Sequence, residues 1–566
     1  MLFLIKDDNM IEQLKNDIKT LLEEKLHLEN LVVEEPKKGN ADLAIPLFAF
    51  AKTLKKSPMD VFKDFETVLK EEPRIKTIEF MNGFLNMYLD REKFALPLIS
   101  KIIDENQNYG QSTVGSGETV VMDYSSPNIA KSFGVGHLRS TMIGNALKNI
   151  YKKCGYDVVA VNHLGDWGTQ FGKMIVAYKL WGNDDEIKQN PIAELQKLYV
   201  KFHDAEKEDP SLEDQAREVF KSLEEGNDEY FKLWTWFKDE SLREFMDMYD
   251  LLGVSFDSFN GEAFYNDKMD AVVSELEEKG LLKLDQGATI VELPNDLPPA
   301  LIKKTDGATL YITRDLAAIM YRHKTYHANR ILYVVGNEQQ LHFKQLKAVT
   351  DLMGYNFDIE HINFGLVLID GKKMSTRGGK FKRLEDVVNQ AISDAKQAVI
   401  EKNPNLKNQD EVAKAVGVGA IIFNDLKNER HLDVDFNLAN MLKFEGMTGP
   451  YLQYSSVRIE SILKEVELNS DMIDPSYYLE DHYFEVIKLL AQFPVIIEKA
   501  KDNNAPNQIA RYITSLAQAF NSFYGKQRLL VEDERHLQAN MHFIKAIQIV
   551  INEGLRLLGI TSLKEM

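Results

Sequence analysis

The chain has 566 residues, of which 44% are hydrophobic and 27% are charged, as is usual for a soluble globular protein. This length exceeds what one hydrophobic core supports and predicts about three to four domains. The single cysteine, Cys154, excludes an internal disulfide and a zinc site built from several cysteines, and it fits a reducing cytoplasm.

The net charge of −19 argues, as an average, against a nucleic-acid partner, but the charge is uneven. Residues 371–383 carry six Lys or Arg and no acid, and such a basic patch can bind RNA on an acidic chain. A surface charged only for solubility remains the alternative. No stretch approaches the ~18 apolar residues of a membrane span, and the apolar run at 1–5 is too short for a signal peptide. We therefore expect a protein that is neither secreted nor membrane-spanning.

The first hundred residues predict a small α/β domain. Apolar residues at helical spacing, from Ile11 to Leu22, indicate a helix over 8–28, and a second helical stretch covers 43–70. Strand-like runs at 75–80 and 84–89 are separated by a turn that contains Asn82 and Gly83. The domain boundary is expected near 110.

Strand and helix patterns alternate through the middle of the chain, over 111–385. The strand candidates are residues 119–123, 158–161, 289–293, 330–335 and 362–369. Such alternation predicts a parallel, doubly wound sheet that binds its ligands at the carboxyl ends of the strands. Residues 184–250 have the pattern of a helical insertion.

The remainder, 386–566, predicts an all-α bundle. Helical periodicity covers residues 384–402, 409–427, 439–467, 482–500, 506–525 and 536–558. Gly559 is placed to end the last helix.

A first candidate phosphate site lies just before a helical pattern at 138–151. Small residues, Lys131 and His137 precede this helix, and a helix amino terminus with its N–H groups attracts polyphosphate. Gly136 lets a nucleotide approach the backbone because it has no Cβ, and His137 can donate to a phosphate oxygen. A core or capping role is the alternative for His137.

A second candidate phosphate site is the basic segment 371–380. Lys373 and Ser375 lie on a loop flanked by glycines, which can close over a triphosphate as a lid. A solvated run of charge is the alternative for Lys373. The two segments together suggest a nucleotide held from both sides.

These two segments and four further blocks resemble the arginyl-tRNA synthetases of class I. The first segment reads Ser126-Pro127-Asn128-Ile129-Ala130-Lys131 before Gly136-His137-Leu138-Arg139-Ser140-Thr141. The other blocks are Asn162-His163-Leu164-Gly165-Asp166-Trp167-Gly168-Thr169-Gln170-Phe171-Gly172, Tyr311-Ile312-Thr313-Arg314-Asp315, residues 333–343, and Gly449-Pro450-Tyr451-Leu452-Gln453-Tyr454. They follow in order along most of the chain.

Two positions depart from the pattern of the class. Gly134 stands where the class usually has histidine, and Thr376 stands where it often has lysine. Lys131 could supply the missing positive charge, which is a hypothesis.

The resemblance implies a Rossmann-type catalytic core and an arginine–tRNA ligase activity. ATP would activate L-arginine to arginyl-adenylate, and the arginyl group would then pass to the 3′-terminal ribose of tRNA(Arg). The resemblance further implies that the N-terminal domain contacts the tRNA elbow and that the helical bundle reads the anticodon. We expect Mg²⁺ to enter with ATP, with no structural metal, no DNA and no membrane partner, in a cytoplasmic monomer.

Arginine specificity requires carboxylates, because the planar guanidinium presents fixed donors that suit bidentate acceptors. Tyr311 and Asp315 are four residues apart and would share one helix face. The resemblance assigns both to the guanidinium, together with Asp123. An ordinary amphipathic tyrosine and an exposed acid are the alternatives.

The remaining site residues are also carried by the resemblance. The substrate's backbone end and the pocket walls are assigned to Ser126, Pro127, Asn128, His137 and Gln339. ATP binding and catalysis are assigned to Gly136, His137, Lys131, Lys373, Met374 and Ser375. Recognition of RNA favours aromatic and cationic side chains, which makes Gln453, Tyr454 and Arg458 the best tRNA contacts; core packing is the alternative for such aromatics. His323 and His327 have zinc-compatible spacing but lack further ligands, so no metal site is predicted.

Two rival functions remain open. A class I synthetase for another amino acid is opposed by the pair Tyr311 and Asp315. A non-catalytic tRNA-binding relative is encouraged by Gly134 and Thr376, and it is opposed by the intact His137 and Lys373.

Overall fold

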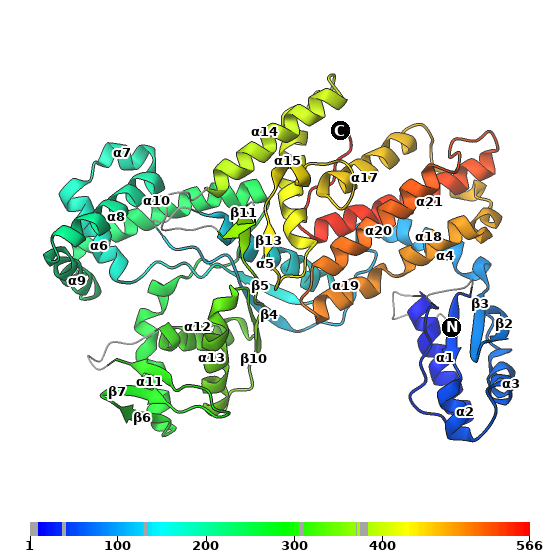
Figure 1. The fold of residues 1–566 in the computed structure, drawn as a ribbon, viewed down its shortest axis with the longest axis horizontal. Coiled ribbons are helices and arrows are strands. Elements are labelled where there is room, and N and C mark those ends of the chain that lie inside the picture. The colour runs from blue at the N-terminus through cyan, green and yellow to red at the C-terminus, as the bar shows by residue number, and fades with distance from the viewer. Residues whose placement is uncertain (1–9, 37–40, 130–132, 305–310, 370, 374–382) are drawn as a thin grey trace.

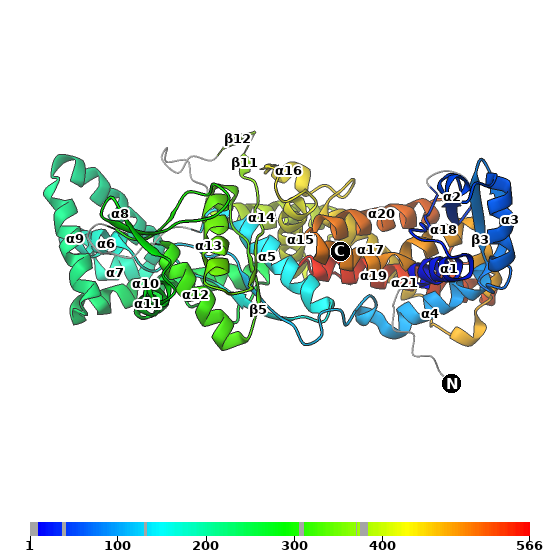
Figure 2. The ribbon, with the colours of Figure 1, turned by 90° about the horizontal axis from the view of Figure 1, so that it is seen from below.

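The computed structural model describes residues 10–36, 41–129, 133–304, 311–369, 371–373 and 383–566. Figures 1 and 2 show an elongated molecule with helices α6–α9 at one end and the N-terminal α/β unit at the other. No helix in the described part of the chain is long and apolar enough to cross a membrane.

The N-terminal unit is a three-stranded antiparallel sheet covered by helices. Its elements are α1 (Met10–Leu26), β1 (Leu43–Pro46), α2 (Phe48–Leu54), α3 (Pro58–Leu69), β2 (Ile75–Met81) and β3 (Phe84–Leu89), and the strand order is β1-β3-β2. The helix predicted over 43–70 is wrong at its start. Residues Leu43–Pro46 pair with β3 instead, and Ser57 caps a new helix whose first residue is Pro58.

The central part of the chain contains the predicted parallel sheet. Its strands are β4 (Thr119–Asp123), β5 (Asp157–Val161), β9 (Arg330–Tyr333) and β10 (Asp358–His361), in the order β10-β9-β4-β5, and every pair is parallel. The chain leaves β4 for β5 on one side and later adds β9 on the other. The gap between β4 and β9 is therefore the topological switch point, where such sheets bind ligands.

Helices cover both faces of this sheet. Alternate residues of β4 point to opposite faces, so Val120 and Met122 join one core cluster while Val121 joins another. The first cluster contains the buried side of α5 (Val135–Lys153). The second contains α11 (Met269–Glu278), α12 (Tyr311–Tyr326) and α13 (Gln340–Leu352).

Two of the predicted core strands lie elsewhere. The strand predicted at 289–293 is β7 (Ala288–Val291), the centre of a separate antiparallel sheet with β6 (Leu282–Asp285) and β8 (Ala300–Lys303). The strand predicted at 362–369 is only β11 (Val367–Ile369), which pairs with β12 (Lys372–Lys373) and β13 (Val434–Asp435). Apolar runs reveal strands but not the sheet to which each strand belongs.

Helices occupy the chain between β5 and α11. They are α6 (Thr169–Trp181), α7 (Asp184–Gln189), α8 (Pro191–Glu208), α9 (Ser211–Glu224) and α10 (Asp228–Leu252). A 3₁₀ helix at Glu262–Lys268 then returns the chain to the sheet.

The C-terminal part is helical, as predicted. It contains α14 (Leu384–Lys402), α15 (Gln409–Leu426), α16 (Leu438–Met441), α17 (Gly449–Leu463), α18 (Asp481–Ala491), α19 (Phe493–Asp502), α20 (Asn507–Tyr524) and α21 (Glu534–Leu557). The single helix predicted at 482–500 is two helices, because Pro494 lacks the N–H of a helix interior and opens α19 instead. Gly559, with φ of 77°, follows α21 in the left-handed conformation.

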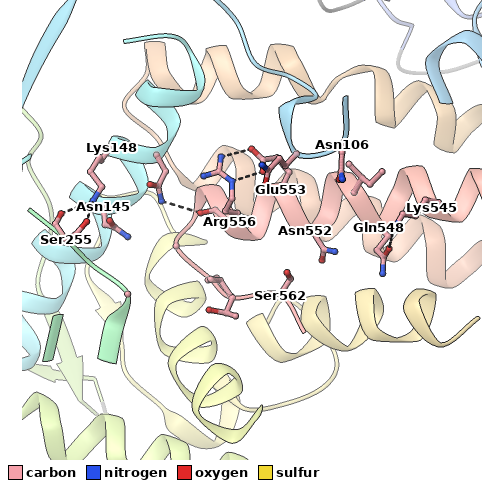
Figure 3. A pocket seen from close by; sticks show the side chains of 17 residues that line it. Asn106, Asn145, Lys148, Ser255, Lys545, Gln548, Asn552, Glu553, Arg556 and Ser562 are labelled. Carbon is pink, nitrogen blue, oxygen red and sulfur yellow. Dashed lines mark hydrogen bonds and ion pairs between the residues drawn. The ribbon is translucent and has the colours of Figure 1, made fainter. Parts of the chain in front are cut away.

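The part that contains the parallel sheet and the C-terminal helices meet along α5 and α21, beside α4 (Ala95–Glu105), which comes from the N-terminal side. A polar cavity of about 600 Å³ lies at this junction, and Figure 3 shows the side chains that line it. Lys148 of α5 donates to the Ser255 carbonyl at 2.8 Å, and burial lowers the pKa of Lys148 to about 8. The buried pair of Lys153 and Glu553, 2.9 Å apart, joins α5 to α21 directly.

Candidate active site at the switch point of the parallel sheet

Asp123 is the last residue of β4 and lies at the switch point beside Tyr333, its register partner on β9. Its side chain is buried. One carboxylate oxygen lies 2.7 Å from Nη2 of Arg322, and the other accepts a hydrogen bond of 2.9 Å from the Ser126 hydroxyl. The carboxylate predicted for the arginine pocket is therefore held by the chain's own guanidinium.

Arg322 of α12 is only 1% exposed. It lies 3.3 Å from the hydroxyl of Tyr333 and 3.4 Å from Nδ1 of His163. Burial lowers the pKa of His163, so the neutral ring can accept at Nδ1. The sequence prediction missed Arg322, although it follows Asp315 by seven residues and so returns to the same face of α12 two turns later.

Tyr311 and Asp315 lie on α12, which begins at Tyr311. Tyr311 is 67% exposed, whereas Asp315 is half-buried with Oδ2 2.6 Å from Nε2 of His342. Burial disfavours the charged carboxylate, but the hydrogen bond and charge of His342 outweigh it, and the pKa of Asp315 lies below its ordinary value. His342, in the first turn of α13, was also missed.

Two further carboxylates belong to the same cluster. Asp166 is completely buried between the N–H of Ala263, at 2.8 Å, and Nζ of Lys238, at 2.7 Å. Burial raises the pKa of Glu262 to about 7, opposed by Arg314 at 3.4 Å and reinforced by Asp315 and Asp166. This cluster is thus rich in carboxylates, each facing a cationic or protonatable side chain or a backbone donor.

The loop after β4 places Ser126, Pro127 and Asn128 along the block that begins at Asn162. The N–H of Ser126 donates to Asn162 Oδ1 at 3.2 Å, and the Pro127 carbonyl accepts from the N–H of Gly165 at 3.0 Å. Asn128 is exposed and forms an isolated β-bridge with Gly165. Ser126 has φ of 47°, a left-handed conformation that costs a non-glycine residue about 1 kcal/mol and is concentrated at functional sites.

The amino terminus of α5 carries the first phosphate candidate. His137 accepts a hydrogen bond at Nδ1 from the N–H of Gly134, 3.1 Å away, and its ring stacks on Phe133. One ring nitrogen therefore caps the helix, and in the neutral ring the proton lies on Nε2. Gly136 is exposed, and among the described residues no atom beyond its chain neighbours and its own helix backbone lies within 4 Å of the position of a Cβ there.

The second phosphate candidate is described only at its edges. Lys131, Met374 and Ser375 lie outside the described residues, and only the backbone of Lys373 is described, as the end of β12. Just after this segment, the N–H of Leu384 donates to the Phe133 carbonyl at 3.0 Å, and Arg383 forms a β-bridge with Gly134. The described residues that follow the second segment therefore lie against Phe133 and Gly134, directly before α5.

One strip of the C-terminal part, residues 425–436, makes direct contacts with both segments. Arg139 of α5 lies 2.8 Å from Asp425 and donates to the Leu432 carbonyl at 2.8 Å. Within the same strip β13 pairs with β11, and the N–H of Gly371 donates to Asp435 at 3.0 Å. Arg139 was not singled out from the sequence.

The remaining predicted positions divide into surface and interior. Gln339 is exposed on a 3₁₀ helix just after β9. Tyr454 and Arg458 form a half-buried cationic and aromatic group with Lys402 and Tyr524, with Arg458 5.0 Å from the Tyr454 ring centroid.

The position of the Gln453 side chain contradicts its predicted role. Its side chain is 0% exposed and donates to the carbonyls of Ala415 and Thr561 at 3.0 and 2.8 Å. A side chain consumed in this way offers RNA no surface, so the predicted tRNA contact of Gln453 is wrong.

Within the described ranges, no three His, Cys, Asp or Glu side chains form a group that could hold a metal ion. His323, half of the zinc-compatible pair, lies with Nδ1 3.1 Å from the Ala328 carbonyl.

Comparison with known proteins identifies three families along the chain. Residues 98–438 match the tRNA synthetases class I (R) catalytic domain, residues 452–566 the DALR anticodon binding domain, and residues 8–89 the arginyl tRNA synthetase N terminal domain. An arginine–tRNA ligase of Exiguobacterium sibiricum is 49% identical over 94% of this chain and 95% of its own length. Arginine–tRNA ligase 1 of Bacillus cereus is 48% identical over 98% of this chain and 99% of its own length.

A solved structure shares the fold. The arginyl-tRNA synthetase of Thermus thermophilus superposes with a TM-score of 0.82 at 23% identity, covering 98% of this chain and 100% of that chain. This likeness and the order of the three family models along the chain confirm the predicted fold class. The chain therefore belongs to the arginyl-tRNA synthetases, a family of class I tRNA synthetases.

Proposed function

We propose that this chain ligates L-arginine to tRNA(Arg) at the switch point of its parallel sheet. In the first step an oxygen of the arginine carboxylate attacks the α-phosphorus of ATP, a C–O–P anhydride forms, and pyrophosphate leaves. In the second step a hydroxyl of the 3′-terminal ribose attacks the arginyl carbonyl carbon, and AMP leaves.

The observation that carries this proposal is the position of Asp123 and Asp315. Both carboxylates lie in one electrostatic cluster at the carboxyl ends of β4 and β9, and Arg322, which binds Asp123, also favours the charged form of Asp315. A guanidinium needs such acceptors, and their location is where doubly wound sheets bind ligands. Tyr311, at the exposed start of α12, closes the side chain end of this pocket.

The backbone end of arginine would be held by the loop after β4 and by the 3₁₀ helix after β9. Ser126, Pro127 and Asn128 line the first, and Gln339 is exposed on the second. His137 lies between this end and the phosphates, with Nε2 as the donor of its neutral ring.

ATP would lie over the amino terminus of α5. Gly136 leaves open space for the nucleotide, and the meeting of Leu384 with Phe133 supports two segments that act on one ligand. We assign Lys373, Met374 and Ser375 to the triphosphate and Lys131 to the charge that Gly134 and Thr376 do not provide. Mg²⁺ would arrive with ATP as part of the substrate, since it keeps waters and phosphates as ligands.

We place the domains at 1–110, at 111–385 with its insertion at 184–250, and at 386–566. The tRNA would contact the first and the last of them as well as the site in the middle domain. Tyr454 and Arg458 present stacked aromatic and cationic groups of the kind that RNA loops bind. We infer a cytoplasmic monomer, which fits the single buried cysteine.

ATP–pyrophosphate exchange tests the function. We expect exchange with arginine, and not with lysine or glutamine, when tRNA(Arg) is present. Absence of exchange both with and without tRNA would refute the enzyme activity and favour a tRNA-binding relative. Exchange with another amino acid would refute the specificity alone.

A further inference from the structure

Each of the two proposed substrate carboxylates is held by a different cationic or protonatable side chain of the protein. Arg322 holds Asp123 at 2.7 Å, and His342 holds Asp315 at 2.6 Å. We propose that Arg322 and His342 are positioning residues that set arginine affinity by fixing the direction in which these carboxylates face the substrate. This inference rests on the arginine pocket proposed above.

The position of Arg322 suits a role in the site better than a role in stabilising the fold. It is 1% exposed, and its Nε is buried without a hydrogen-bond partner among the described residues. A buried guanidinium with an unused donor costs stability, and replacing a whole buried ion pair by apolar side chains is often neutral or favourable. Its contacts with Asp123, Tyr333 and His163 all lie at the strand ends.

The Arg322 contact leaves Asp123 able to accept a second guanidinium. A carboxylate can accept about four hydrogen bonds, and two are formed here, from Arg322 and from Ser126. A buried carboxylate without a cation tends to lose its charge, whereas a charged acceptor binds a guanidinium about twice as strongly as a neutral one. Arg322 thus preserves the charge and fixes the rotamer.

His342 performs the matching task on the other side of the pocket. Its Nε2 faces Asp315 from the first turn of α13, while its ring packs edge-on against Phe343. Asp315 lies within electrostatic reach of Arg322, seven residues along the same helix. Without His342, the Asp315 carboxylate would be drawn toward Arg322 and away from the substrate.

Steady-state aminoacylation with two double-mutant cycles tests this proposal. The first cycle combines Arg322→Met with Asp123→Asn, and the second combines His342→Ala with Asp315→Asn. Each variant is measured for the KM of arginine, the KM of ATP and kcat. His342→Gln is the conservative variant, because its amide nitrogen can reach the place of Nε2.

We expect Arg322→Met to raise the KM of arginine about 30-fold or more and that of ATP less than about threefold. Added to Asp123→Asn, it should change the KM of arginine by less than about threefold, because its partner is already neutral. His342→Ala should behave in the same way toward Asp315→Asn, and His342→Gln should recover most of the affinity.

Matched controls separate positioning from general damage. Arg330→Met removes another paired arginine, which lies on β9, and His323→Gln changes a histidine that lies on α12. Both should leave the KM of arginine unchanged. If Arg322→Met does not fold, Arg322→Lys keeps the charge but loses the planar fork, and its KM of arginine should still rise about tenfold.

Three results would overturn the inference in distinguishable ways. Equal increases of both KM values, or multiplicative effects within a cycle, would refute positioning while leaving the pocket intact. Full loss of affinity in His342→Gln would refute the role of its donor. An unchanged KM of arginine in Asp123→Asn and Asp315→Asn would refute the proposed pocket itself.

Discussion

At the scale of single residues, each of three carboxylates in the proposed site faces one cationic or protonatable side chain. Asp123, Asp315 and Asp166 face Arg322, His342 and Lys238, respectively. Of these acids, Asp123 and Asp315 were assigned from the sequence through the family resemblance, which agrees with the need of a guanidinium for carboxylates, whereas Asp166 was not singled out. Their partners were not assigned from the sequence, since Arg322 and His342 touch no feature of the substrate and are defined only by which elements the fold brings together.

Replacing Asp315 should affect one substrate selectively. Asp315→Ala should raise the KM of arginine by about 30- to 150-fold, or ~2–3 kcal/mol, because the guanidinium loses an acceptor that is about three-quarters buried. The KM of ATP should change little. Measuring both constants in aminoacylation checks this, and equal changes would remove Asp315 from the pocket.

Glu262 should make stability depend on pH. Its native pKa of about 7 lies above the ordinary value of 4.5, so the native state keeps a proton that the unfolded chain releases. Stability should therefore fall as the pH rises from about 4.5 to about 7, by ~3 kcal/mol at most. Glu262→Gln should remove this fall and be the more stable form at pH 8. Urea unfolding at pH 5 and pH 8 tests it, with the exposed Glu292→Gln as the control that should retain the parent's slope.

Lys131 should matter for chemistry at the phosphates. Lys131→Ala should slow adenylate formation about 100-fold, because one positive group is lost where the transferring phosphoryl gathers charge. Pre-steady-state pyrophosphate release measures this step. Lys221→Ala, an exposed lysine of α9, is the control, and equal slowing in both variants would end the compensation hypothesis.

At the scale of elements, periodicity located helices well and strand partners poorly. Helices α1, α5, α14, α15, α20 and α21 follow their predicted ranges within a few residues, because each buries one apolar face. The break at Pro494 could have been predicted from the sequence, because proline lacks the N–H that a helix interior requires. By contrast, β7 and β11 left the predicted sheet because strand order depends on contacts between distant segments, which a single sequence does not show.

Two residues of helix α17, Gln453 and Arg458, are expected to have different roles. Arg458→Ala should raise the KM of tRNA about 5- to 30-fold, because it removes a cation stacked between Tyr454 and Tyr524. Gln453→Met should leave this KM unchanged but lower the free energy of unfolding by about 2 kcal/mol, because two buried carbonyls lose their donor. Aminoacylation kinetics and urea unfolding of both variants distinguish the roles. The reverse assignment of effects would restore Gln453 to the RNA surface.

At the scale of the whole molecule, the C-terminal helices are joined to the catalytic core by buried charges. Arg139 and Asp425 are 2% and 5% exposed, and the pair joins α5 to α15. Arg139→Met should lower the free energy of unfolding by about 3–5 kcal/mol, since Asp425 would be left buried without a cation. Thermal unfolding measures this, and Arg217→Met, on the exposed side of α9, should have no comparable effect. A loss below about 1 kcal/mol would contradict the interior role of the pair.

The strip at residues 425–436 has a mechanical consequence. It contacts α5 through the pair of Arg139 and Asp425, and it contacts β11 through β13. The two segments proposed to bind phosphate are therefore attached to the same twelve-residue stretch of chain, so that the position of each relative to the other is fixed by the C-terminal part rather than by the parallel sheet alone.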